Sequence, residues 1–161
     1  MTNKKITTLN KLIPIVKKLK FQNKKIVTTN GVFDILHLGH VKYLEAAKKM
    51  GDVLIVGINT NTSTRQNKGN KGPINDEKSR MAVLAGLESV DYIFLFNEKD
   101  PRKWVEKIKP DIHVKASDYK MRQIIEKSTV LKNGGKIVIA KMEKNYSTTK
   151  IINKILESYK K

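Results

Sequence analysis

The sequence contains no cysteine, which excludes disulfide bonds, thiolate metal sites and cysteine nucleophiles. It also lacks a continuous apolar run of the roughly 18 residues that a membrane-spanning helix needs. The N-terminal residues include lysine but not the apolar core of a secretory signal peptide. Together these absences favour a cytoplasmic enzyme or binding protein with no membrane segment.

The two most common phosphate-binding loops are also missing. The pattern GxxxxGK[ST] does not occur, and no GxGxxG follows the first predicted strand. These absences argue against a P-loop kinase and against a dehydrogenase that uses a dinucleotide.

Acidic residues are scarce, since 15 Asp and Glu stand against 33 Lys and Arg, and the net charge is +18. Such a charge favours an anionic partner, such as a nucleotide, a phosphorylated metabolite or a nucleic acid. Surfaces that bind nucleic acid usually combine arginine with aromatic residues. Here the basic residues are nearly all lysine, scattered over the predicted helices, and aromatic residues make up 6% of the chain. We therefore interpret the charge mainly as a compositional bias that also steers phosphate ligands.

Short apolar runs alternate along the chain with helical patterns, which is typical of an α/β protein with a parallel sheet. Strands are predicted at residues 25–29, 52–60, 92–96, 112–115 and 136–142. Helices are predicted at 9–20, 39–50, 76–85, 101–109, 121–132 and 147–159, and a polar loop at 61–73.

This order of elements predicts a Rossmann-like, three-layer α/β domain with a mainly parallel, five-stranded sheet. Ligands of such sheets bind at the carboxyl ends of the strands. We expect residues 1–24 to form a helical extension packed on the domain, and the domain itself to span 25–161.

The segment from Thr29 to His40, which follows the first predicted strand, reads Thr-Asn-Gly-Val-Phe-Asp-Ile-Leu-His-Leu-Gly-His. His37 and His40 are three residues apart, so both can lie on one face of a helix that begins near Gly39. The free N–H groups and the dipole at a helix N-terminus attract anions, and glycine allows a close approach. The spacing therefore predicts a phosphate site. Two alternatives remain open: a structural role for the histidines, or a zinc site in which Asp34 is the only strong third ligand nearby.

Thr29–His40 resembles the signature of the HxGH nucleotidyltransferases, in the cytidylyltransferase-like branch, and most closely the subgroup of sugar-phosphate adenylyltransferases that act on heptose 1-phosphate. The resemblance extends over nearly the whole chain. Further matching blocks lie at Asn59–Arg80, Met81–Leu84, Glu88–Asp91, Pro110–Tyr119 and Tyr146–Ile152.

The chain departs from the family pattern at three places. Asn61 stands where aspartate is usual, and Gly72 stands where a larger, often basic residue is common. Ala116 and Ser117 replace a pair of glycines. The histidine turn is intact, so the reaction type is retained, whereas the altered pocket loop leaves the identity of the sugar open.

The resemblance implies transfer of an adenylyl group from ATP to a sugar 1-phosphate, with heptose 1-phosphate as the first choice, giving ADP-sugar and pyrophosphate. It implies Mg²⁺ bound with ATP, no metal site in the protein, and a homodimer. Some relatives are fused to a sugar kinase, for which 161 residues leave no room, so we expect the acceptor to arrive already phosphorylated. One alternative is a CTP-dependent cytidylyltransferase acting on a polyol or amino-alcohol phosphate. A basic nucleic-acid-binding module is the alternative outside enzymes, although it would not need the paired histidines.

The resemblance also implies the roles of individual residues. His37 and His40 would donate to the triphosphate, and Lys68 would bridge the two reacting phosphates as the third catalytic residue. The nucleotide-binding residues would be Asn30, Gly31, Phe33, His37, Gly39, His40, Arg80, Ser147, Thr148 and Thr149. The substrate-binding residues would be Asp34, Lys68, Lys115, Asp118 and Tyr119.

Some of these residues also have simpler interpretations. Taken alone, Ser147, Thr148 and Thr149 favour plain helix capping. Lys115 and Arg80 are equally compatible with exposed surface charges.

Overall fold

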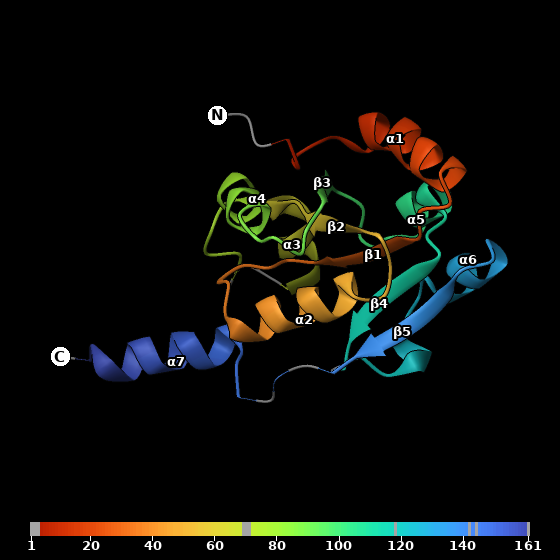
Figure 1. Cartoon of the computed structure of the whole chain (residues 1–161). Coiled ribbons are helices and arrows are strands. Elements are labelled where there is room, and N and C mark those ends of the chain that lie inside the picture. Colours follow the sequence, from red (N-terminus) through yellow and green to blue (C-terminus); the bar gives the residue numbers. More distant parts are fainter. Residues whose placement is uncertain (1–3, 69–71, 118, 142, 144, 161) are drawn as a thin grey trace.

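A computed structural model describes the chain at residues 4–68, 72–117, 119–141, 143 and 145–160 (Figure 1). Its centre is one five-stranded sheet in the order β3-β2-β1-β4-β5, in which every neighbouring pair is parallel. The strands are β1 (Ile26–Gly31), β2 (Val53–Asn59), β3 (Tyr92–Phe96), β4 (Ile112–Ala116) and β5 (Lys136–Ala140). The order reverses between β1 and β4, and ligands of parallel sheets bind at such a switch point.

Helices cover both faces of the sheet (Figure 1). One face carries α1 (Leu9–Phe21), α5 (Arg102–Ile108) and α6 (Lys127–Lys132), and the other carries α2 (Leu38–Lys48) and α4 (Glu77–Ala85). Consecutive strand residues such as Ile26 and Val27 are fully buried in different core clusters, because successive side chains point to opposite faces. Trp104 is fully buried in the cluster under α1 and α5. The prediction of a Rossmann-like three-layer domain is confirmed.

The segment predicted as a polar loop contains a helix, α3 (Asn61–Lys68), so that part of the prediction was wrong. The Thr60 hydroxyl accepts the backbone N–H of Ser63 at 3.1 Å, which caps the first turn. Ser63 and Thr64 are buried, and the Ser63 hydroxyl accepts from the side chain of Asn59 at 3.0 Å. The polarity that indicated a loop therefore serves to cap and anchor a helix.

The helix predicted at 121–132 is interrupted. A short 3₁₀ helix (Met121–Gln123) is followed by an extended residue, Ile124, before α6 begins at Lys127. Ile124 and Glu126 are buried within this break, with exposed fractions of 4% and 1%. A continuous helix is lost because the chain turns the Glu126 side chain under β4 instead of leaving it at the surface.

Other boundaries differ by one or two residues. The fifth strand ends at Ala140, and α5 begins at Arg102, one residue later than predicted, with Pro101 in the capping position. The last helix, α7 (Thr148–Ser158), has no buried residue and projects from the body of the molecule (Figure 1). Helix α1 packs on the sheet, while the division at residue 24 stays a prediction. None of the helices in the described ranges is long and apolar enough to span a bilayer.

Candidate active site

A pocket of about 420 Å³ lies at the carboxyl ends of β1 and β4, where the strand order reverses. The predicted site residues that line it are Asn30, Gly31, Phe33, Asp34, His40, Lys115 and Tyr119. A second, more open hollow of about 520 Å³ lies against α5 and contains none of the predicted residues. We place the candidate site in the first pocket, because, of these two, it is the one that joins the strand ends to a histidine.

The turn after β1 brings an aromatic ring under the histidines. Phe33 has a φ of 49°, in the left-handed region that is strained for a bulky residue. Phe33 is buried, with an exposed fraction of 7%. The centroid of its ring lies 5.3 Å from that of the His40 ring. A Cβ on Gly31 would lie 3.0 Å from the Phe33 ring, so glycine at this position leaves room for the ring.

The rings of His37 and His40 stack at the start of α2, with centroids 3.8 Å apart and planes 23° from parallel. The prediction that both lie on one face of the helix entrance is confirmed. His37 is the N-cap residue, and burial lowers the pKa of its imidazole, which favours the neutral ring at pH 7. Its Nδ1 is buried and has no hydrogen-bond partner among the described residues. A Cβ on Gly39 would lie 3.0 Å from the His37 ring, so this glycine lets the imidazole rest on the helix.

Asp34 holds the loop before α4 against the turn after β1. Its two carboxylate oxygens accept the backbone N–H groups of Ile74 and Asn75, each at 2.8 Å. The side chain of Asn75 donates in return to the carbonyl of Asp34 at 2.8 Å. Asp34 lines the pocket, but both oxygens of its carboxylate already accept hydrogen bonds from the protein backbone.

Arg80 is buried, with an exposed fraction of 1%, so its interpretation as a surface charge is wrong. Its guanidinium donates to the carbonyls of Val32, Asn59 and Asn75. It also donates to the side-chain oxygen of Asn61 at 2.8 Å. Asn61 stands at the position where the family usually has aspartate. Burial lowers the pKa of Arg80, and this effect outweighs the charges of nearby carboxylates, which raise it. Arg80 therefore ties the ends of β1 and β2 to the loop before α4 and lies behind the pocket wall.

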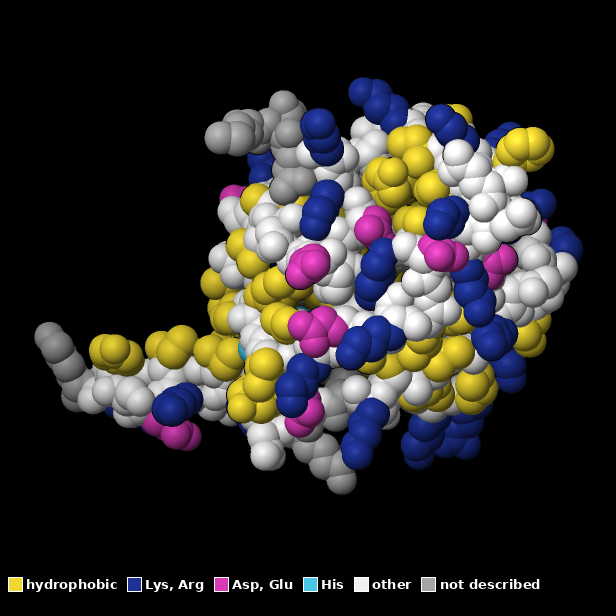
Figure 2. Space-filling model, viewed as in Figure 1, with side chains coloured by type: hydrophobic (Ala, Val, Ile, Leu, Met, Phe, Trp, Pro, Cys, Tyr) yellow, Lys and Arg dark blue, Asp and Glu magenta, His cyan; other side chains and the backbone are white. Residues whose placement is uncertain are grey.

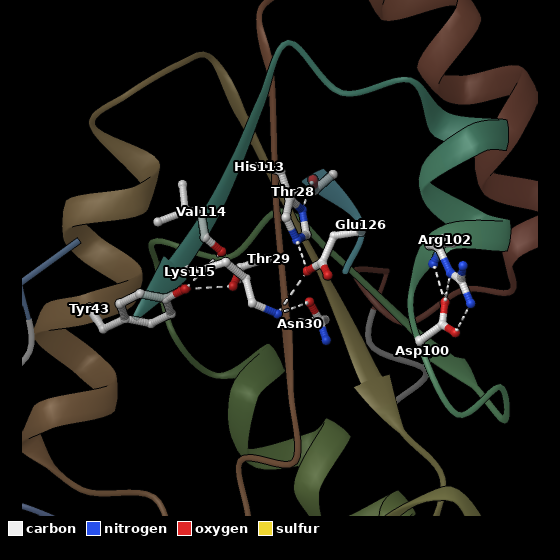
Figure 3. Close-up of polar contacts among 10 residues, drawn as sticks. All are labelled: Thr28, Thr29, Asn30, Tyr43, Asp100, Arg102, His113, Val114, Lys115 and Glu126. Atoms are coloured by element: carbon white, nitrogen blue, oxygen red, sulfur yellow. Dashed lines mark hydrogen bonds and ion pairs between the residues drawn. The ribbon is translucent and has the colours of Figure 1, made fainter. Parts of the chain in front are cut away.

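Lys115 is also buried, with an exposed fraction of 6%, which rules out its interpretation as a surface charge (Figure 3). Its Nζ donates to the side-chain oxygen of Asn30 at 3.1 Å and lies 2.9 Å from Oε1 of Glu126. The same ammonium lies 4.7 Å from the centre of the Tyr119 ring. The structure therefore brings together residues from β1, β4 and the break before α6.

Sequence reasoning missed Glu126, which pairs with Lys115, and His113, which contacts Glu126 (Figure 3). Nε2 of His113 lies 3.0 Å from Oε1 of Glu126, and Nδ1 lies 2.8 Å from the hydroxyl of Thr28. His113 lies within a predicted strand, and its alternation with Lys115 was a weak signal that both share a face. Glu126 gave no signal, because it lay in a segment predicted to be helical.

The charge states in this network follow from burial and contact. Burial opposes ionisation of Glu126, but the hydrogen bond from His113 and the charge of Lys115 outweigh it and lower the pKa of Glu126 to about 2. Burial lowers the pKa of His113, so its ring is neutral. An ionised Glu126 can only accept, so we assign the proton of His113 to Nε2, and the Thr28 hydroxyl then donates to Nδ1.

The Ser-Thr-Thr segment begins α7, and the Ser147 hydroxyl accepts the backbone N–H of Lys150 at 3.1 Å. The capping interpretation is thus confirmed for Ser147. The preceding Tyr146 packs beside Gly39, and an ion pair of 2.8 Å joins Lys42 to Glu143, so the N-termini of α2 and α7 lie close together.

These hydroxyl groups do not line the pocket among the described residues. The side chain of Lys68 and residue Asp118 lie outside the described residues, so their predicted roles are not placed.

Residues 28–154 match the model of the cytidylyltransferase-like family. The chain belongs to this family. The recognition made from Thr29–His40 is therefore confirmed.

The bifunctional protein HldE of Actinobacillus succinogenes is 49% identical over 150 residues, which cover 93% of this chain and 32% of that protein. The HldE protein of Geobacter metallireducens is 44% identical over 155 residues, or 96% of this chain and 32% of that protein. The chain thus spans about a third of the length of these curated relatives.

Solved structures give the same picture. The lipopolysaccharide core biosynthesis protein from Thermoplasma volcanium is 40% identical, with a TM-score of 0.64 over 77% of this chain and 99% of that chain. Pantoate-beta-alanine ligase from Francisella tularensis superposes with a TM-score of 0.64 over 94% of this chain and 77% of that chain. Its identity is 22%, so this second likeness supports the fold alone.

Proposed function

We propose that the chain transfers an adenylyl group from ATP to a sugar 1-phosphate, with heptose 1-phosphate as the first substrate, and releases pyrophosphate. The observation that carries this proposal is the stacked pair His37 and His40 at the start of α2, beside a pocket at the switch point of the sheet. Membership of the cytidylyltransferase-like family supports the reaction class. The choice of adenylyl group and sugar rests on the resemblance carried by the blocks between Asn59 and Ile152.

In this reaction an oxygen of the acceptor phosphate attacks the α-phosphorus of ATP. The new P–O bond forms as the bond to the pyrophosphate group breaks, and no covalent enzyme intermediate is needed. A sugar phosphate is already ionised near neutral pH, so the reaction does not require a strong general base. Catalysis then depends on positioning and on stabilising the charge that develops on the phosphates.

The start of α2 supplies donors for that charge. His37 and His40 stand at the N-terminus of this helix, where the helix dipole adds a partial positive charge. We assign His37 and His40 to the triphosphate as hydrogen-bond donors. The neutral state of His37 suits this role, because a neutral imidazole donates without adding repulsion within the stacked pair.

Helix α3 would bring Lys68 to the pocket. Asn67, the residue before it, lines the pocket and donates to the carbonyl of Lys99 at 3.2 Å. We propose that Lys68 bridges the two reacting phosphates and offsets their repulsion. Mg²⁺ would accompany the triphosphate and neutralise part of its charge. Among the described residues no group of three or more His, Asp or Glu side chains is placed to hold a metal ion.

The test is a pyrophosphate-release screen of the purified chain with four nucleoside triphosphates against sugar phosphates and alcohol phosphates. Product formation is followed by the mass of the nucleotide sugar. We expect product from ATP with a sugar 1-phosphate, and none from ATP with the free sugar. Turnover of CTP with glycerol phosphate or ethanolamine phosphate, without turnover of ATP and heptose 1-phosphate, would contradict the substrate assignment.

The homodimer implied by the family resemblance and the cytoplasmic location favoured by the composition stay predictions. Sedimentation of the purified chain at several concentrations would test the first, because a dimer dissociates on dilution whereas a monomer keeps one sedimentation coefficient.

A further inference from the structure

The floor of the pocket carries a carboxylate that the proposed phosphate chemistry does not require. Glu126 lines the pocket although only 1% of its surface is exposed. Both contacts of its carboxylate, from Lys115 and from His113, are made to Oε1. Oε2 has no partner within the part of the chain that the structure describes. A buried carboxylate thus keeps one oxygen available at the wall of the site.

The charges at this point argue against a phosphate ligand. Lys115 and Glu126 lie 2.9 Å apart and carry opposite charges, and the neutral ring of His113 adds none. A phosphate placed on Lys115 would also meet the carboxylate of Glu126, which repels it. An ammonium group placed on Glu126 would meet Lys115 in the same way.

A hydroxyl group fits both members of the pair, because it donates one hydrogen bond and accepts others. It can donate to Oε2 of Glu126 and accept from Nζ of Lys115. The sugar part of an acceptor offers several such groups on one ring, whereas its phosphate offers acceptors only. Tyr119 and Ile125 line the same end of the pocket with apolar surface, on which the carbon face of a sugar can pack.

We propose that Glu126 and Lys115 form the subsite for the hydroxyl groups of the sugar ring. The acceptor then lies with its ring over the end of β4 and its phosphate toward His37 and His40. Glu126 selects acceptors that present a hydroxyl donor at this end. His113 is a positioning residue that holds the Glu126 carboxylate in place. This inference rests on the proposed function, since it concerns the acceptor of that reaction.

The experiment measures binding rather than turnover, by titration calorimetry of the full chain. Its ligands are heptose 1-phosphate, a series of single-deoxy analogues and inorganic phosphate. The proteins are the wild type, Glu126→Gln and the control Glu88→Gln, which changes the net charge equally at an exposed residue. Gln keeps the size of the side chain and an acceptor oxygen but removes the charge that strengthens a hydrogen bond.

We expect Glu126→Gln to bind heptose 1-phosphate about tenfold more weakly, the size of a lost charge-assisted hydrogen bond. Inorganic phosphate should bind the variant no more weakly than the wild type, and Glu88→Gln should match the wild type throughout. One deoxy analogue should bind the wild type about tenfold more weakly and lose nothing further in Glu126→Gln, because the two partners of one contact are removed together.

Equal or tighter binding of heptose 1-phosphate by a folded Glu126→Gln would overturn the proposal, since Glu126 would then be only a counterion for Lys115. If Glu126→Gln does not fold, Glu126→Asp takes its place, because it keeps the charge and withdraws the oxygens by one methylene group. Sugar binding that depends on Glu126 without any turnover would contradict the proposed function and leave the subsite standing. Turnover with no dependence on Glu126 would do the reverse, and no binding of any sugar phosphate would overturn both.

Discussion

Most polar side chains around the pocket already have hydrogen-bond partners within the protein. Asp34 accepts two backbone N–H groups, and Arg80 donates to three carbonyls and one amide. Such residues hold the site in one geometry, so that little reorganisation is needed when a ligand binds. His37 differs, because its buried Nδ1 has no partner in the described ranges. We therefore expect the histidines to act on the reaction and Arg80 to act on the structure.

Replacing His40 by alanine tests the first part of this view. We expect kcat to fall about a hundredfold or more, as for a lost donor to a transition state. ATP affinity should change much less, because ground-state binding is distributed over many contacts. Steady-state kinetics and calorimetric titration with ATP separate the two effects. Near wild-type turnover in a folded His40→Ala would remove this residue from the mechanism.

The buried pair His113 and Glu126 predicts a loss of stability in acid. Burial lowers the pKa of His113 below 6.5, so its contribution is present above that pH and is lost as the pH falls below it. The pKa of Glu126 is lowered from 4.5 to about 2, so its contribution is present above 4.5 and is lost as the pH falls through this range. A shift of this size corresponds to about 3 kcal/mol.

Urea unfolding between pH 8 and pH 3 measures this effect. The free energy of unfolding of the wild type should fall in two stages, and the stage below pH 4.5 should be smaller in Glu126→Gln. Parallel curves for the two proteins would contradict the assignment of charge to Glu126.

At the scale of elements, hydrogen bonds between segments distant in the chain hold the pocket together. Tyr43 on α2 donates to the carbonyl of Val114 at 3.0 Å and lies 2.7 Å from the hydroxyl of Thr29 (Figure 3). This places α2 against both strands of the switch point. On the other side of the pocket, the backbone N–H groups of residues 74–75 donate to Asp34 and hold the segment between α3 and α4 against the turn after β1. We call this pair of hydrogen bonds the clamp.

Asp34→Asn should loosen this clamp. An amide keeps one acceptor oxygen but turns N–H donors toward a backbone N–H, so one charge-assisted hydrogen bond is lost. We expect the amides of Ile74 and Asn75 to exchange about tenfold faster with solvent, and KM for ATP to rise.

Hydrogen exchange followed by NMR or mass spectrometry measures the change. Asp52→Asn is a matched control, because Asp52 accepts the backbone N–H of Lys25 at 2.7 Å at the opposite end of the sheet. Its exchange near residues 74–75 and its kinetics should equal those of the wild type. Equal protection of Ile74 in both variants would show that the clamp does not hold the loop.

At the scale of the whole molecule, basic side chains are spread widely. Figure 2 shows Lys and Arg distributed over the visible face, interrupted by acidic and apolar side chains, without one large basic patch. On this face the net charge of +18 therefore acts as a diffuse field rather than as a binding surface.

A diffuse field predicts weak binding of nucleic acid that depends steeply on salt. Between about 50 mM and about 200 mM salt, we expect binding of a labelled DNA duplex to fall a hundredfold or more. Turnover of ATP and sugar phosphate should change far less, because hydrogen bonds in a pocket are less screened than surface charges. Fluorescence anisotropy and the pyrophosphate assay give the two measurements. Tight, sequence-dependent binding at the higher salt concentration would instead favour the nucleic-acid-binding alternative.

The sequence by itself determined the alternation of strands and helices, the parallel sheet and the histidine turn. These features depend on local periods of apolar residues and on spacing within one short segment, such as His37 to His40, which neighbouring residues alone decide. The same reasoning placed the pocket at the carboxyl ends of the strands, which share one edge of a parallel sheet, while the family resemblance named seven of the residues that line it.

Only the tertiary structure decided which polar residues are buried, and for what purpose. Arg80 meets Val32, 48 residues away, and Lys115 meets Asn30, 85 residues away. A charged side chain can be buried only when such partners are in place, and periodicity does not reveal partners so distant in the chain. For the same reason the helix predicted through Glu126 breaks, because the contacts that this carboxylate makes with His113 and Lys115 favour a bend over another turn of helix.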